Sequence, residues 1–115
     1  MKNPEQGDLF YLQWSPSVGH EFRNNRPGVV ISSNKTIGKS NLISFMALTS
    51  NTNNKMADDI LIKRSKSNNL QLDSVIKVQY ISSFDYKRLL RYIGKVDGSD
   101  GEDIKRYLKK HFDLK

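Results

Sequence analysis

The sequence predicts a single domain over residues 1–115 that is mainly β, a small antiparallel barrel with one C-terminal α-helix. Three observations support this fold class. The apolar runs are short and bounded by turn-forming or polar residues, no helical pattern lies between them, and helical periodicity appears only near the end of the chain. Strands without alternating helices argue against a parallel sheet. Closure into a barrel would protect the sheet edges from unwanted pairing.

The first apolar run, residues 9–14, is aromatic and lies between Gly7 and Pro16, which favours a strand over a helix. The later runs are rich in Val, Ile, Leu and Phe and are divided by Gly, Asn, Ser and Lys. Strands are therefore expected at residues 9–14, 29–31, 42–48, 60–62, 75–81 and 92–96.

One amphipathic helix is expected at the end of the chain. Ser99 and Glu102 have the spacing of a capping box, in which two side chains satisfy free backbone N–H groups at a helix start. Apolar residues follow at helical intervals: Ile104, Tyr107, Leu108 and Phe112. A short turn is expected to begin at Ser82 or Ser83 and to include residues 84–86, joining two strands.

The charge balance favours a polyanionic partner. Nineteen Lys and Arg against twelve Asp and Glu give a net charge of +7, which suits nucleic acid, although a basic balance can also serve solubility alone. The absence of cysteine excludes a disulfide framework and a thiolate zinc site. No apolar run has the length of a signal peptide or a membrane span, so we expect a cytoplasmic protein that does not associate with membranes.

Two polar segments, residues 15–27 and 49–55, concentrate hydrogen-bonding groups and are expected to be working loops. A metal site is not expected. His20 and His111 are far apart in the sequence, and Asp58 and Asp59 would point to opposite faces of a strand. No Gly-rich phosphate loop is present, and no cofactor is expected.

Chemistry without a metal remains available, because RNA can be cleaved by its own 2′-hydroxyl when a protein moves protons and stabilises the phosphorane. Arg26 suits that charge, since its planar guanidinium can hold two phosphate oxygens and stays protonated. Pro27 restricts the backbone next to it. The alternative is a surface arginine that pairs with Glu21.

The chain resembles the MazF/PemK family of toxin endoribonucleases over nearly its whole length. The residues that carry the resemblance are Gly7-Asp8, Pro16-x-x-Gly19-x-Glu21, Arg26-Pro27-x-Val29-Val30-x-Ser32, Thr49-Ser50, Asp73-Ser74-Val75 and Ile81-x-x-x-Asp85-x-x-x-Leu89. The resemblance implies an SH3-like barrel of the CcdB/PemK type and a homodimer. It also implies metal-independent cleavage of single-stranded RNA at short sequences, and inhibition by a cognate antitoxin protein.

By the same resemblance, Arg26 and Thr49 match the two catalytic positions: Arg26 would stabilise the phosphorane and Thr49 would orient the scissile phosphate, with Ser50 beside it as a substrate contact. Glu21 matches the acidic residue of the first loop, where it could pair with Arg26, help proton transfer or contact a base. His20 replaces a small hydroxyl residue and could act as a general acid or base, or be a plain exposed histidine.

The chain departs from the family near the end of the fifth predicted strand, where Ser82 stands in place of a common arginine. Gln79 could read a base edge or face solvent. Tyr80 could stack on a base or pack in the core. The other basic residues could line the path of an RNA backbone or be solvated surface; they include Lys63, Arg64, Lys66, Arg88 and Arg91.

Two other functions compete with the nuclease. The same barrel could belong to a non-enzymatic toxin that binds nucleic acid or poisons DNA gyrase, which does not need the Arg26 and Thr49 pair. A degenerate toxin that keeps only antitoxin binding is the third possibility, suggested by the departures at Tyr80 and Ser82.

Overall fold

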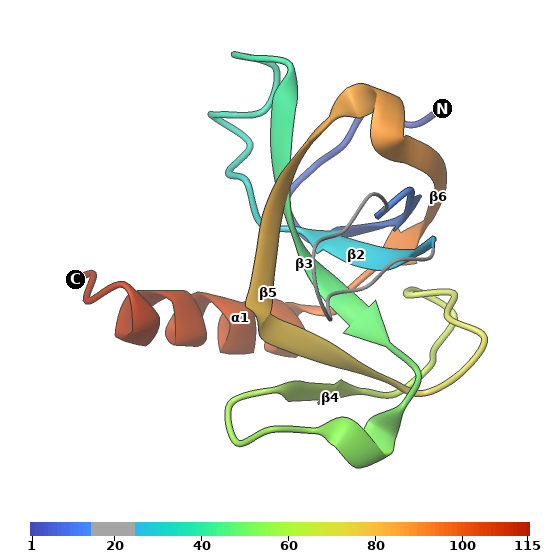
Figure 1. Ribbon diagram of the computed structural model, residues 1–115, viewed down its shortest axis with the longest axis vertical. Coiled ribbons are helices and arrows are strands. Elements are labelled where there is room, and N and C mark those ends of the chain that lie inside the picture. The colour runs from blue at the N-terminus through green and yellow to red at the C-terminus, as the bar shows by residue number, and fades with distance from the viewer. Residues whose placement is uncertain (15–24) are drawn as a thin grey trace.

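The computed structural model describes residues 1–14 and 25–115. Along these residues lie six strands, two short 3-10 helices and one α-helix (Figure 1). None of the described helices is both long enough and apolar enough to cross a membrane. In chain order the elements are β1 (Asp8–Leu12), β2 (Arg26–Val30), β3 (Leu42–Thr49), η1 (Thr52–Asn54), β4 (Ile60–Ile62), β5 (Ser74–Asp85), η2 (Tyr86–Arg88), β6 (Leu89–Lys95) and α1 (Gly98–His111).

The strands form one antiparallel sheet in the order β4-β5-β3-β2-β1-β6. The prediction of a mainly β fold with a C-terminal helix is confirmed, but closure of the barrel is not, because no ladder joins β4 to β6 among the described residues. The loop that follows β4 takes the place of that ladder. Lys95 N–H donates to the carbonyl of Ser67 at 2.9 Å, and the Asn69 amide donates to the carbonyl of Ile93 at 3.0 Å. A loop therefore covers the edge that β6 would otherwise expose.

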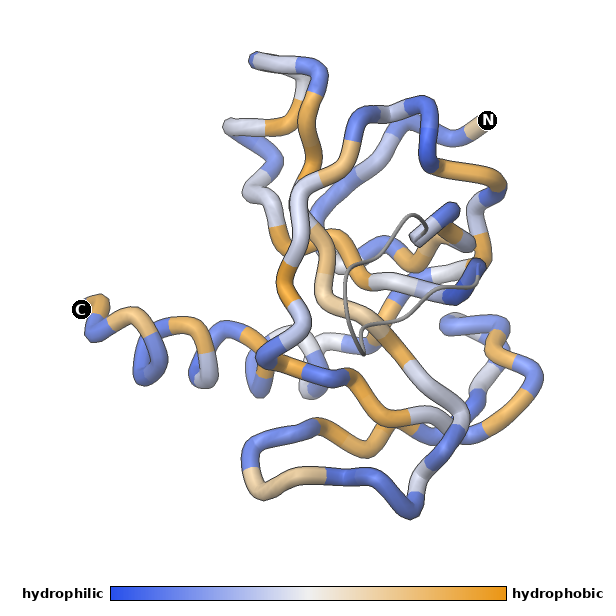
Figure 2. Tube along the Cα trace, viewed as in Figure 1, coloured by the Kyte–Doolittle hydropathy of each residue, from blue (hydrophilic) through white to orange (hydrophobic). Residues whose placement is uncertain are grey.

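Both faces of the sheet are buried, which explains why the central strands have almost continuous apolar runs. Neighbouring residues alternate between two clusters: Leu9 and Met46 belong to the first, and Phe10 and Phe45 belong to the second. The first cluster includes Ile104 and Tyr107, the two buried residues of α1. Figure 2 shows this distribution, with hydrophobic residues along the strands and a mostly hydrophilic loop between β3 and β4.

Strand β5 is longer than predicted and strongly bent. It continues through Asp85, so the turn does not begin at Ser82 or Ser83; instead Asp85 caps η2 by accepting the N–H of Lys87 at 2.9 Å. The register against β3 jumps between Met46–Ile81 and Ala47–Lys77. Three residues of β5 are left over at this irregularity, which bends the strand.

The predicted capping box at the start of α1 is wrong. Asp97 is the cap, because its carboxylate accepts the N–H of Asp100 at 3.0 Å and the hydroxyl of Ser99 at 2.8 Å. Ser99 already lies inside the first turn, where its backbone is helical. Of the apolar residues predicted on the helix, Phe112 is exposed at the C-cap.

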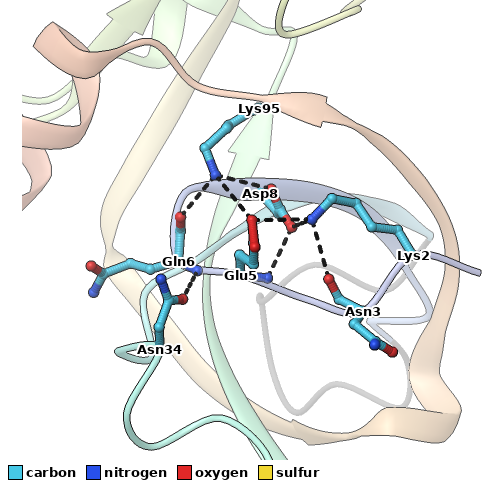
Figure 3. Close-up of polar contacts among 7 residues, drawn as sticks. All are labelled: Lys2, Asn3, Glu5, Gln6, Asp8, Asn34 and Lys95. Atoms are coloured by element: carbon cyan, nitrogen blue, oxygen red, sulfur yellow. Dashed lines mark hydrogen bonds and ion pairs between the residues drawn. The ribbon is translucent and has the colours of Figure 1, made fainter.

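The Gly7-Asp8 pair has a structural role at the start of β1. Asp8 is fully buried, and its carboxylate accepts from the Lys2 ammonium at 2.7 Å and from the N–H of Glu5 at 2.9 Å. Lys95 of β6 completes the cluster at 3.4 Å (Figure 3). Gly7 has a φ of +90°, a conformation that side chains with a Cβ rarely adopt. This pair fixes the N-terminal segment to the last strand.

Candidate active site

The largest described cavity, about 420 Å³, lies where the start of β2 and the end of β3 separate. The β2–β3 ladder pairs Gly28 with Ala47 and then stops. Pro27 follows on the open side and has no N–H with which to extend a ladder. Extending the same register by two residues sets Arg26 opposite Thr49, and both residues line the cavity. The described lining residues are Tyr11, Asn25, Arg26, Pro27, Leu48, Thr49, Ser50, Asn69, Leu70, Gln71, Leu72, Ser74, Arg91 and Ile93.

Arg26 is the first residue of β2 and is half-buried beside β1, where its partner in the ladder is Leu12. Burial lowers the pKa of the Arg26 guanidinium from its ordinary value, while nearby Tyr11 acts on that pKa in the opposite direction. The group nevertheless keeps its charge at neutral pH. A partly desolvated guanidinium interacts more strongly with an anion than an exposed one does.

Thr49 is the last residue of β3 and is held by its ladder partner Val75 on β5. Its hydroxyl oxygen accepts the N–H of Asn51 at 3.2 Å. Because that bond uses a lone pair, the hydroxyl hydrogen is still able to donate to a phosphate oxygen. Ser50 is exposed on the same wall of the cavity.

A buried ion pair supports the loop that leaves Thr49. The Lys77 ammonium of β5 lies 2.6 Å from the Asp59 carboxylate and also donates to the carbonyl of Asn54 at 2.7 Å. Asp59 in turn accepts the N–H groups of Met56 at 2.9 Å and Val78 at 3.2 Å. These contacts fasten the middle and the C-terminal end of the 50–59 loop to β5, next to its bend.

The opposite wall is the loop after β4, which depends on Gly94. A Cβ built on Gly94 would lie 2.5 Å from the carbonyl oxygen of Asn68, so only glycine allows the loop to approach β6 this closely. Asn69 has a φ of 54°, a conformation that asparagine tolerates better than most residues. The sequence analysis missed this loop as part of the site, since its residues carry no chemical motif.

The described lining is cationic. It contains Arg26 and Arg91 and no aspartate or glutamate among the described residues. A site with this charge suits a phosphate or carboxylate ligand. Of the other basic residues, Arg64 lies in a neighbouring hollow with Ser50, and Arg88 lies elsewhere, over the ring of Phe84.

Gln79 and Tyr80 do not join Arg26 and Thr49. They lie at the bend of β5 and line a separate hollow of about 200 Å³ with Trp14, Ile81 and Ser82. Gln79 is exposed, whereas Tyr80 is half-buried and packs against the second core cluster.

His20 and Glu21 lie outside the described residues. His111 stacks on Tyr107, with ring centroids 5.2 Å apart. In the described part of the chain, no three His, Asp or Glu side chains lie together as ligands for a metal ion.

The antiparallel sheet, the C-terminal helix and the cavity lined by two arginines define a class of small basic β domains. Comparison with known proteins gives the family. Residues 5–112 match the family described as PemK-like, MazF-like toxins of type II toxin-antitoxin systems, and the chain belongs to that family. The predicted family is therefore confirmed.

Individual relatives agree with this assignment. The chain is 29% identical to Endoribonuclease MazF9 of Mycobacterium tuberculosis over 95% of this chain and 96% of that protein. The crystal structure of MazF from Deinococcus radiodurans superposes with a TM-score of 0.83 at 18% identity, covering 99% of this chain and 100% of that one. An endoribonuclease from a mycobacterial species, solved in complex with its cognate antitoxin, has a TM-score of 0.70 at 17% identity, covering 100% of this chain and 98% of that one. The solved structures show that this chain shares their fold.

Proposed function

We infer that the chain, as one domain over residues 1–115, is the toxin of a type II toxin-antitoxin system and cuts single-stranded RNA at short sequences without a metal. The observation that carries this proposal is that Arg26, at the start of β2, and Thr49, at the end of β3, line the same cavity, whose described lining is cationic. The name of the mycobacterial relative, an endoribonuclease, supports the same activity.

The chemistry follows from the two side chains. The 2′-hydroxyl of the substrate attacks the adjacent phosphorus, the bond to the 5′-oxygen breaks, and a 2′,3′-cyclic phosphate and a free 5′-hydroxyl result. Arg26 stabilises the extra negative charge of the phosphorane, and the hydroxyl of Thr49 orients the scissile phosphate by donating to one of its oxygens. Ser50 is placed to contact the same strand. His20 and Glu21 remain the candidates for proton transfer.

Gln79 and Tyr80 would contact a different part of the substrate. Their hollow is separate from the cavity of Arg26, so they are candidates for contact with a base away from the scissile bond. Stacking on Tyr80 and hydrogen bonding to the Gln79 amide are both suited to unpaired RNA.

The proposed partners are single-stranded RNA, a cognate antitoxin and a second copy of the chain, in the cytoplasm. The structure of a mycobacterial relative in complex with its antitoxin supports the second of these. An antitoxin with an acidic segment would complement the net charge of +7, and high salt should weaken both RNA and antitoxin binding.

The test is incubation of the purified protein with a long unstructured RNA in excess chelator, followed by sequencing of the fragment ends. The wild type should cut at a recurring short motif, and Arg26→Ala should lower the rate by about a hundredfold or more. Arg106→Ala is the matched control, because Arg106 is exposed on α1 and pairs with Asp103 at 2.7 Å. A pure, folded Arg26→Ala protein that cuts at the wild-type rate would refute the mechanism, and loss of cleavage in chelator would refute its metal independence.

A further inference from the structure

A second arginine lies on the same cavity, and nothing in the family resemblance assigns it a role. Arg91 is exposed on β6 and is the direct ladder partner of Tyr11 on β1. Its guanidinium carbon lies 5.1 Å from the centroid of the Tyr11 ring, within the range of a cation–π interaction. The ring therefore gives a preferred orientation to a side chain that would otherwise be free in solvent.

Tyr11 also connects this arginine to Arg26. Its ladder partner on the other side is Pro27, the residue next to Arg26 on β2. Since neighbouring strands are about 4.8 Å apart, the backbones of β2 and β6 are separated by roughly 10 Å, with the Tyr11 strand between them. Two arginines from the strands on either side of β1 thus line one cavity.

The charge of Arg91 is not neutralised within the described residues. Some other cations are neutralised by a carboxylate: Lys77 pairs with Asp59, Lys95 with Asp8, and Arg106 with Asp103. No ion pair joins Arg91 to a described carboxylate. The described lining of its cavity contains no aspartate or glutamate. A guanidinium held over a ring, at the edge of a cavity with this lining, is available for a planar two-oxygen contact with a phosphate.

We propose that Arg91, oriented by Tyr11, binds a second phosphate of the RNA, next to the scissile phosphate held by Arg26. This inference rests on the proposed function and names a further substrate-binding residue of the same site. Arg91 does not take part in the chemical step, so it contributes to the binding of the strand and to the placement of the scissile bond.

The experiment measures binding separately from cleavage. A fully 2′-O-methylated oligonucleotide cannot be cut, and its sequence is taken from the mapped cleavage motif, or is mixed if the wild type cuts nothing. Its affinity for the wild type, Arg91→Ala, Arg91→Lys and Arg106→Ala is measured over a range of salt concentrations. For a single strand, loss of one phosphate contact should reduce the slope of log K against log salt by about 0.7.

Arg91→Ala should show that reduced slope, bind about tenfold or more weakly, and raise KM with little change in kcat. Arg91→Lys should restore the slope but only part of the affinity, because an ammonium neither stacks nor forms two parallel bonds in the same way. Arg106→Ala should match the wild type in every measurement.

The location of the contact has its own test. A cleavable RNA with one neutral methylphosphonate at the linkage adjacent to the scissile bond should bind to the wild type about tenfold more weakly than unmodified RNA does. The affinity of Arg91→Ala should be the same for both RNAs. An equal loss of affinity in the wild type and in Arg91→Ala would refute a contact between Arg91 and that linkage.

The outcomes separate this inference from the proposed function. If Arg91→Ala keeps the wild-type slope and KM while the wild type cleaves RNA, the role of Arg91 is refuted and the nuclease stands. If the wild type binds with an Arg91-dependent slope but cuts nothing, only the nuclease is refuted. If the wild type neither binds an oligonucleotide nor cuts RNA, both are refuted, and a large loss of kcat at unchanged KM would refute a pure binding role.

Discussion

Removing the Asp59 carboxylate should be among the most damaging single changes outside the apolar core. The side chains of Lys77 and Asp59 are only 8% and 3% exposed, and their charged atoms lie 2.6 Å apart. Asp59→Ala leaves a buried ammonium whose remaining partner is the carbonyl of Asn54, and it leaves the N–H groups of Met56 and Val78 without an acceptor.

The expected cost follows from these losses. Breaking a buried pair from one side costs about 3–5 kcal/mol of unfolding free energy, and the buried N–H of Val78 left without an acceptor costs about 1–3 kcal/mol within the same range. For a chain of 115 residues this corresponds to a melting temperature lower by roughly 12–20 °C. Cleavage should also fall, because the loop that leaves Thr49 keeps only the Lys77–Asn54 contact of its attachment to β5.

The assay is urea unfolding of Asp59→Ala beside Asp58→Ala. The neighbouring aspartate is a matched control, since its pair with Lys110 at 3.2 Å is 45% and 72% exposed and should be worth less than about 1 kcal/mol. Adding Lys77→Met to Asp59→Ala should recover part of the loss by removing the unpaired charge. An Asp59→Ala protein within about 1 kcal/mol of Asp58→Ala, or further destabilisation by Lys77→Met, would refute the reasoning.

Three further changes can be checked by melting curves and the cleavage assay. Gly94→Ala should destabilise the protein by about 2 kcal/mol or more and reduce cleavage, because the added Cβ meets the backbone of Asn68 at 2.5 Å; an unchanged melting temperature would contradict the close approach. Gly101→Ala, at an open position inside α1, should instead stabilise by about 0.5–1 kcal/mol and leave cleavage unchanged. Burial, together with Asp97 and Asp103, raises the pKa of Asp100 from 3.8 to about 6. The folded state therefore binds this proton more tightly than the unfolded state, and stability falls as pH rises from about 4 to 6. Asp100→Asn should flatten that decline; a wild-type pH dependence in the variant would show that Asp100 does not cause it.

Local patterns were enough to find the strands but not their ends. Each predicted apolar run lies within or overlaps an observed strand, because burial on a sheet selects β-branched and aromatic residues directly. The ends depended on competition between neighbouring polar groups. Asp97 rather than Ser99 caps α1. Strand β5 does not end at Ser82, because Ser82 is paired with Phe45 of β3.

The closure of the sheet was also beyond local patterns. A barrel is the expected solution for a short antiparallel chain, yet the edge of β6 is covered by the loop that contains Ser67 and Asn69. That loop approaches β6 because Gly94 has no side chain, and a single glycine within a strand gives no sequence signal of which segment it faces.

By itself the sequence determined the secondary structure class, the basic charge and the family, because these depend on residue types and their order along the chain. Only the tertiary structure decided which residues share a cavity. Strand pairing brought Arg26 and Thr49 to the same cavity, paired Tyr11 with Arg91 and left Gln79 beside a separate hollow. Register is set by contacts between segments far apart in the sequence, so no local pattern contains it.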